Sequence, residues 1–257
     1  MKRKITSAKY WWYYEMFNNE ISLIKDGHLD LRRSAEQMIK NYGFSHEALK
    51  KALEIGVPIA YEKLCNRIKN GELHHETGEL KHESEARKLI KDYGLDPKRL
   101  EEALKIGAQI AYENYLKYIK KGYLHLRDQV KAFIKKYEKY GLSPKLLEDA
   151  LKEGASVAYE ERLNWIKKGD LDYEIEARKL IKYYGVDPKR LEEALKIGAQ
   201  VIYEDLLSLI KRGKLSYEID ARELIKAYGL DPKRLEETLK EGASVVYEKH
   251  LKQIKKR

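Results

Sequence analysis

Apolar residues recur along this chain with a helical period, in segments of two lengths. In one short segment, Ala86, Leu89, Ile90 and Tyr93 fall at i, i+3, i+4 and i+7, the core-facing stripe of an amphipathic helix. A longer apolar pattern of the same kind follows almost at once. Between the two lie a glycine, an apolar residue, an aspartate and a proline, which predict the end of one helix and the start of the next. The pattern therefore predicts a tight helical hairpin.

The sequence of this hairpin recurs several times along the chain. The stretch YGLDPKRLEEALKIGA, residues 93–108, recurs in close copies from Tyr140, Tyr184 and Tyr228 and in a more diverged copy from Tyr42. Three glycines mark the copies: the second lies 13 residues after the first, and the third lies 28 residues after it. The shortest return to the next copy is 16 residues, so the basic period is 44 residues. A period of this length is typical of stacked helical arrays.

In period and organisation the chain resembles armadillo/HEAT-type α-solenoids, a generic likeness that covers nearly its whole length. The resemblance implies an all-α fold: a right- or left-twisted α-solenoid of five repeats of ~44 residues plus an N-terminal capping helix. The expected boundaries are 1–29 for the capping helix and 30–71, 72–122, 123–169, 170–213 and 214–257 for the repeats. Together these are expected to form one continuous domain.

Each long helix has a glycine near its middle: Gly56, Gly107, Gly154, Gly198 and Gly242. After this glycine the apolar stripe turns by roughly the angle of one residue. Pro58 follows Gly56, and a proline inside a helix removes a backbone hydrogen bond. Ser156, at the matching position of a later copy, is placed to cap a new helix. We therefore expect a kink or a break here, giving each repeat two to three helices.

The charge balance adds a second feature to this picture. Lysine and arginine number 52 against 42 aspartate and glutamate residues, a formal net charge of +10. Because both signs are interspersed, the surface is expected to carry many ion pairs, as in thermostable proteins, with an anionic partner as the alternative. A lone cysteine, Cys65, is expected in the core and excludes an intrachain disulfide. With neither a secretion signal nor a membrane span, a cytoplasmic protein is expected.

Basic residues recur in register with the repeat. One set lies on the outer face of the short helix: Arg87, Lys88, Arg178 and Lys179. A second set lies in the first turn of the long helix: Lys98, Arg99, Lys189, Arg190, Lys233 and Arg234. Positive charge there opposes the helix dipole, so the second set lacks an adequate folding reason. Free amides and cations at a helix N-terminus bind phosphate, whereas ion pairs within the helix are the competing explanation.

Aromatic residues supply a further group of candidates. One cluster consists of Trp11, Trp12, Tyr13 and Tyr14. It is expected to cover the first repeat interface, or else to form an exposed hydrophobic patch that binds a partner or a second copy of the chain. Four aromatics that vary between repeats are candidates for base stacking or partner contact: Tyr115, Tyr118, Tyr123 and Trp165. The recurring tyrosines at two positions, represented by Tyr93 and by Tyr112 and Tyr247, are expected in the core.

The segment 71–84 carries His74, His75 and His82 among glutamates. Imidazole and carboxylate bind zinc, but the spacing matches no ligand motif, so a flexible polar loop is expected rather than a metal site. The chain has no phosphate-binding glycine loop, nucleophile elbow or paired-histidine zinc motif. We therefore expect a non-enzymatic binding protein without metal or cofactor. Its favoured ligand is a nucleic-acid backbone; the alternative is a protein–protein interaction scaffold that uses the concave solenoid surface.

Overall fold

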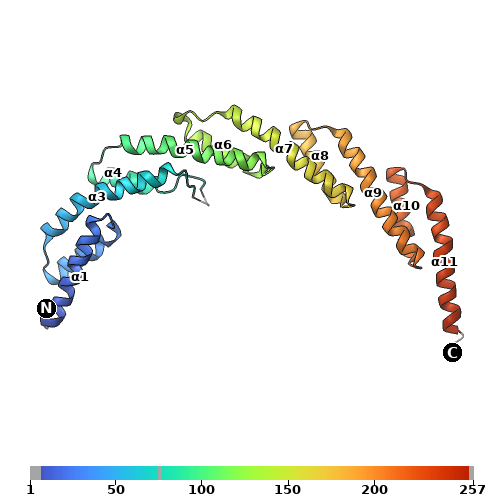
Figure 1. Ribbon diagram of the computed structural model, residues 1–257, viewed down its shortest axis with the longest axis horizontal. Helices are drawn as coiled ribbons and strands as arrows, with labels where there is room; N and C mark the ends of the chain where they lie inside the picture. The colour runs from blue at the N-terminus through green and yellow to red at the C-terminus, as the bar shows by residue number, and fades with distance from the viewer. Residues whose placement is uncertain (1–6, 75–76, 255–257) are drawn as a thin grey trace. The chain divides into compact units, whose positions relative to one another are not determined.

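The computed structural model describes residues 7–74 and 77–254 (Figure 1), and in this part of the chain every element is helical. The expectation of an all-α fold is confirmed. Residue contacts group the chain into two compact units. The first unit is Met1–Leu116 with Asp128–Pro144, and the second is Lys117–Arg127 with Lys145–Arg257. The chain passes from one unit to the other at three points, after Leu116, Arg127 and Pro144.

Short and long helices alternate along the chain. The helix at the N-terminal end is α1 (Ser7–Lys25). The short helices, of 10 or 11 residues, are α2 (Arg32–Tyr42), α4 (Glu83–Tyr93), α6 (Arg127–Lys136), α8 (Glu174–Tyr184) and α10 (Glu218–Tyr228). The long helices, of 23 or 24 residues, are α3 (His46–Lys69), α5 (Lys98–Lys120), α7 (Pro144–Lys167), α9 (Pro188–Lys211) and α11 (Pro232–Ile254). Single turns of 3-10 helix lie in five of the ten connections between these helices.

The links between short and long helices follow the chemistry of their sequence. At the end of α8, Gly185 is left-handed, with φ of +68°, and its amide donates to the carbonyl of Ile181 at 2.9 Å. Asp187 then caps α9 by accepting a hydrogen bond from the Lys189 amide at 3.0 Å. Pro188 is the first helical residue, where its missing amide costs nothing. The predicted hairpin turn is confirmed.

The glycines in the middle of the long helices mark helix crossings rather than helix breaks. All five long helices run without interruption through their glycine, so the expected break is wrong. A Cβ atom added to Gly198 would overlap the carbonyl oxygen of Ile166 in the preceding long helix. The same relation joins Gly56 to Ile24, Gly107 to Ile68, Gly154 to Ile119 and Gly242 to Ile210. We call these five residues the crossing glycines.

Ser156 does not cap a new helix either, because its hydroxyl donates to the carbonyl of Lys152 at 3.1 Å within α7.

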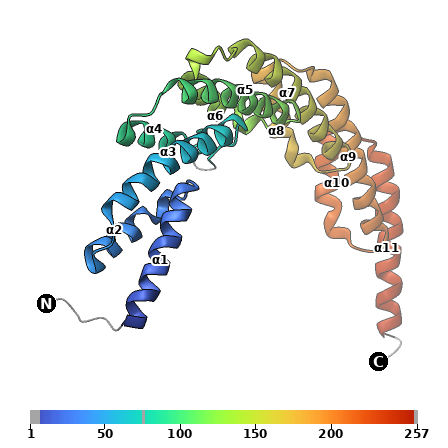
Figure 2. The same ribbon diagram turned by 60° about the vertical axis from the view of Figure 1, so that its left-hand side comes forward.

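Each crossing lies in a core made by consecutive helices. In the second unit, α9 packs against both α10 and α11, and α10 also contacts α11 (Figure 2). Tyr203, Leu207 and Ile210 of α9 are buried against the hairpin formed by the next two helices, where Ala221 and Leu235 are buried in turn. Each helix therefore depends on its neighbours in the sequence for burial.

A buried tyrosine joins each long helix to the next hairpin. The hydroxyl of Tyr203 donates to the carbonyl of Asp231, the residue before the proline that begins α11, at 2.7 Å. We call the four residues that do this the bridging tyrosines: Tyr61 to Asp96, Tyr112 to Ser143, Tyr159 to Asp187 and Tyr203 to Asp231. Tyr61 also accepts a hydrogen bond from the Leu100 amide, and burial raises its pKa to about 12.

The fifth tyrosine at this position behaves differently. The bridging tyrosines are at most 4% exposed, whereas Tyr247 of α11 is 66% exposed. The expectation that Tyr247 belongs to the core is wrong, because among the described residues no hairpin packs on that side of α11.

The crossing contact makes a direct prediction about stability. Substitution of Gly198 by alanine places a methyl group against the Ile166 carbonyl and forces two helices apart. We expect the free energy of unfolding to fall by about 2–3 kcal/mol, measured by denaturant unfolding. Gly185→Ala is the control: its Cβ meets open space, so only the left-handed backbone cost of about 1 kcal/mol is expected. Equal losses at the two positions would contradict the crossing role.

A second prediction uses the two environments of one tyrosine position. Tyr203→Phe removes the hydroxyl that bridges to Asp231, so the unfolding free energy should fall by about 1–2 kcal/mol. Tyr247→Phe makes the same chemical change on an exposed side chain and should leave thermal unfolding unchanged. If both variants lose equal stability, the bridge is not what distinguishes these residues.

Candidate functional site

The arginines at the starts of the long helices are engaged in ion pairs. Arg99 pairs with Glu62, Arg190 with Glu160 and Arg234 with Glu204, in each case across to the preceding long helix. Arg190 and Arg234 bind both oxygens of their glutamates. The hydrogen bonds from Arg234 lower the pKa of the Glu204 carboxyl. The interpretation that these arginines lack a folding reason is therefore wrong; whether they also bind phosphate stays a prediction.

The amides that a phosphate would need at these helix N-termini also have acceptors. In α5 the Lys98 amide donates to the Asp96 carboxylate at 3.0 Å, and the Leu100 amide donates to Tyr61 at 3.1 Å. Asp187 and Asp231 hold the matching amides of α9 and α11 in the same way. An anion arriving at such a terminus would meet a carboxylate and few free donors, which weakens the basis for a phosphate site there.

The arginines of the short helices are also engaged in ion pairs. Arg87 pairs with Glu83 and Arg178 with Glu174, one turn apart on α4 and α8. In α2 the two charges are exchanged, since Arg32 precedes Glu36. In α6 the first and fifth residues are Arg127 and Lys131, which carry the same charge and form no such pair. Among the described short helices the pair is therefore present in α2, α4, α8 and α10, where it links successive turns of the helix.

The lysines of both basic sets remain exposed. Among the described residues, Lys98, Lys189 and Lys233 have no carboxylate partner in an ion pair, and the same is true of Lys88 and Lys179. These five side chains are the part of the predicted basic pattern that is free to meet an external anion.

The predicted aromatic contacts divide into exposed and buried residues. Trp11, Trp12, Tyr118 and Trp165 are all exposed. Tyr13 instead stacks on Tyr42 with ring centroids 4.2 Å apart, so this residue of the cluster covers the first hairpin. Tyr115 is buried against Phe133, so the expectation that it stacks on bases is wrong.

The long helices carry branched aliphatic residues on their outward side. The position before the crossing glycine holds Ile55, Ile106 and Ile197, all exposed. The third position after it holds an aliphatic residue in every long helix: Ile59, Ile110, Val157, Val201 and Val245. We call these eight residues the aliphatic row, and each unit carries its own part of it. Sequence reasoning missed the row because it followed only the buried stripe; branched residues recurring on the polar face were the available signal.

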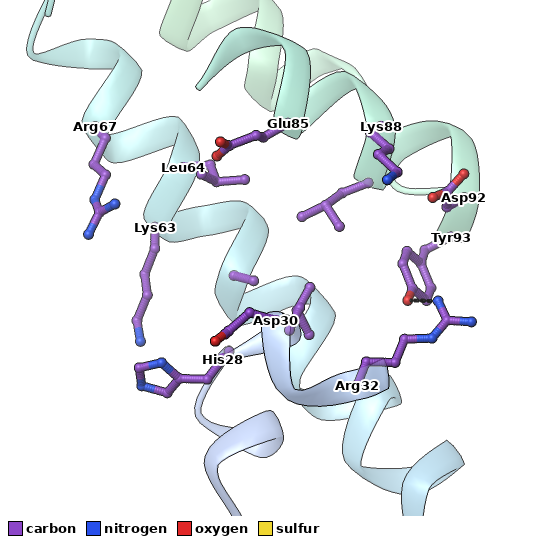
Figure 3. Close-up of a pocket in the computed structure, with 14 residues that line it drawn as sticks. His28, Asp30, Arg32, Lys63, Leu64, Arg67, Glu85, Lys88, Asp92 and Tyr93 are labelled. Carbon is purple, nitrogen blue, oxygen red and sulfur yellow. Dashed lines mark hydrogen bonds between the residues drawn. The ribbon is translucent and has the colours of Figure 1, made fainter. Parts of the chain in front are cut away.

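A cleft of about 660 Å³ lies in the first unit, between the turn after α1, the second half of α3, and α4 (Figure 3). Leu64 and Leu89 give it an apolar part, and charges of both signs surround them. The basic residues are Arg32, Lys63, Arg67 and Lys88, and the acidic residues are Asp30, Glu85 and Asp92. Arg32 already binds the Tyr93 hydroxyl, and Lys63 binds the Asp26 carbonyl at 2.7 Å. This mixed rim selects no single class of ligand.

The inserted segment between α3 and α4 makes specific contacts over the residues described, and its expected flexibility stays a prediction. Leu73 and Leu80 form an antiparallel bridge, and Leu80 is buried. The Leu80 amide donates to the hydroxyl of Tyr137 at 3.1 Å, and that hydroxyl donates to Glu83 at 2.7 Å. His82 has φ of +67° and contacts Glu85, whereas His75 lies outside the described residues. The insertion therefore ties α4 to the end of α6.

Comparisons with protein-family models, curated proteins and solved structures find no match to this chain. None of the helices described is long and apolar enough to cross a membrane. Within residues 7–74 and 77–254, no three His, Cys, Asp or Glu side chains come together to hold a metal ion. Cys65 is buried in α3, as expected for a core residue.

The pairing of Arg234 with Glu204 predicts the effect of reversing its charge. Arg234→Glu should place two carboxylates together and lower the thermal midpoint, by less than Gly198→Ala does because the pair is exposed. Adding Glu204→Arg restores an opposite-charge pair and should recover most of the loss at neutral pH. The pKa of Glu204 is lower in the folded state than in the unfolded state. In the wild type, the ion pair therefore stabilises the fold at pH values above the carboxyl pKa of the unfolded state, and this stabilisation is lost as the pH falls through the carboxyl pKa of the folded state. A loss of stability that the second change cannot recover would contradict the pair.

Proposed function

We propose that this chain is a non-enzymatic α-solenoid of five helical repeats with an N-terminal capping helix, and that it binds another protein along its long helices. The observation that carries the proposal is the aliphatic row. Ile55, Ile106 and Ile197 are 51%, 39% and 47% exposed, and folding gains little from a branched aliphatic side chain left in water. Recurring exposed apolar side chains between polar neighbours are typical of protein interaction surfaces.

The chain itself shows that the fold does not require these isoleucines. Glu153 of α7 and Glu241 of α11 stand at the same position before the crossing glycine. Both glutamates pair with a lysine of the preceding long helix, Lys120 and Lys211, at 2.8 Å. A charged residue is therefore compatible with this position, which supports a role in contact for the isoleucines found in the other three helices.

A second candidate function is binding of a nucleic-acid backbone. It is favoured by the exposed lysines Lys98, Lys189 and Lys233, which recur at the starts of long helices, and by the net charge of +10. Its weakness is that the neighbouring arginines and amides already have partners. On this function the lysines would act as separate point charges along the phosphates.

Two matched triple variants separate the candidates. In Ile55→Glu/Ile106→Glu/Ile197→Glu, each isoleucine is replaced by the residue that two other long helices carry, so helicity and thermal unfolding should remain close to wild type. Lys98→Glu/Lys189→Glu/Lys233→Glu removes the exposed cations instead. Each tagged protein is purified from its source cells through high-salt washes, and its binding to a labelled oligonucleotide is measured over a range of salt.

We expect one defined protein to copurify in stoichiometric amount with wild type and with the lysine variant, and to be lost from the isoleucine variant. The proposal is wrong if the isoleucine variant retains that protein. Nucleic-acid binding takes its place if wild type binds oligonucleotide with a log–log salt slope of about −0.7 to −0.9 per phosphate and only the lysine variant loses this binding.

A further inference from the structure

The outer side of α11 repeats at three positions a surface that the other long helices use for burial, although His250 stands where α9 has the buried Leu206. Five positions after the crossing glycine, Tyr203 of α9 is fully buried and Tyr247 of α11 is 66% exposed. Twelve positions after it, Ile210 is fully buried and Ile254 is 69% exposed. Leu251, where α9 has the buried Leu207, is exposed as well. We call Tyr247, Leu251 and Ile254 the α11 end face.

The interface on α9 shows what fits such a surface. There the matching residues pack against a helical hairpin, α10 followed by α11, with Ala221 and Leu235 buried at the contact. The hairpin supplies two backbone features besides its apolar residues. Its turn presents the Asp231 carbonyl to the Tyr203 hydroxyl, and its long helix places Gly242 on the Ile210 carbonyl. A partner for the α11 end face needs the same two features.

The N-terminal end of a second copy does not have the crossing glycine. Four of the five crossing glycines lie 15 residues before the glycine that follows their own long helix, and the residue 15 before Gly27 is Trp12. An indole at this point cannot approach an isoleucine carbonyl that leaves no room even for a Cβ atom. Helix α1 therefore cannot dock on α11 in the way that the long helices dock on one another, which excludes head-to-tail addition of copies by this geometry.

Charge gives the partner a further property. Beyond Tyr247, the described part of α11 carries His250 and Lys252 with a single acidic residue, Glu248, while Lys249 donates to the Arg212 carbonyl at the end of α9 at 3.4 Å. In α7 the residue at the place of His250 is Arg162, which binds Glu176 in the first turn of α8 at 2.8 Å. Helix α10 also begins with acidic residues, Glu218 and Asp220. An acidic first turn on the short helix of the partner would meet the cations of α11.

We propose that the α11 end face is a docking site for a helical hairpin carried by a partner. Its short helix begins with acidic residues, its turn offers a carbonyl to Tyr247, and its long helix has a glycine where it crosses Ile254. This surface is distinct from the aliphatic row, and the proposal does not depend on the function proposed above.

The probe for this site is a synthetic peptide of residues 214–246, the hairpin that α9 already accepts. Fluorescence anisotropy with the whole chain as receptor should show saturable binding. Tyr247→Glu/Ile254→Glu in the receptor should weaken it by about tenfold or more, because two charges would enter an apolar contact. Ile219→Glu, on an equally exposed isoleucine of α10, is the matched control and should bind as wild type. A peptide with Gly242→Trp, which copies the α1 arrangement, should not bind.

Absence of peptide binding to the wild-type chain would overturn the proposal, as would equal binding by both receptor variants or by the tryptophan peptide. Sedimentation of the chain alone supplies a second readout. A dimer that dissociates in the Tyr247→Glu/Ile254→Glu variant would assign this face to a second copy and overturn the assignment to a partner hairpin.

Discussion

The contact between a crossing glycine and an isoleucine carbonyl is the constraint on which the other contacts depend. With no side chain at Gly198, two long helices approach until the backbone of one touches the backbone of the other. That short separation brings the Tyr159 hydroxyl of one helix within reach of the Asp187 carbonyl, and Arg190 within reach of Glu160. A methyl group at the crossing would therefore weaken the tyrosine bridge and the ion pair together with the helix packing.

Most of the residues that recur in every repeat have a role in folding. The aspartate and proline start a helix, the glycine after the short helix ends one, and the arginine binds a glutamate of the preceding helix. Residues that recur for folding reasons say little about a ligand. The residues that remain are those the fold tolerates without using, namely the exposed isoleucines of the aliphatic row and the exposed lysines beside the helix starts.

The sequence was sufficient for the hairpin turns and the alternation of helices, and insufficient for contacts between helices. Hairpin turns, caps and the alternation of short and long helices follow from neighbouring residues, so they could be predicted. The role of Gly107 could not, because a glycine inside a helix indicates equally a break and a close approach, and only the position of Ile68 distinguishes them. The partners of Arg99 and Arg190 were missed for the same reason: Glu62 and Glu160 lie 37 and 30 residues away along the chain.

The insertion before α4 has a consequence for the order in which the first unit assembles. Where contacts join only successive hairpins, folding can nucleate at any point and spread to either side. The insertion adds Leu80, its hydrogen bond to Tyr137 and the ion pair of Lys136 with Glu79 at 2.6 Å to one such junction. These added contacts favour that junction as the point from which folding of the first unit spreads. Hydrogen exchange would then be slowest at α4 and α6, and opening would begin away from them.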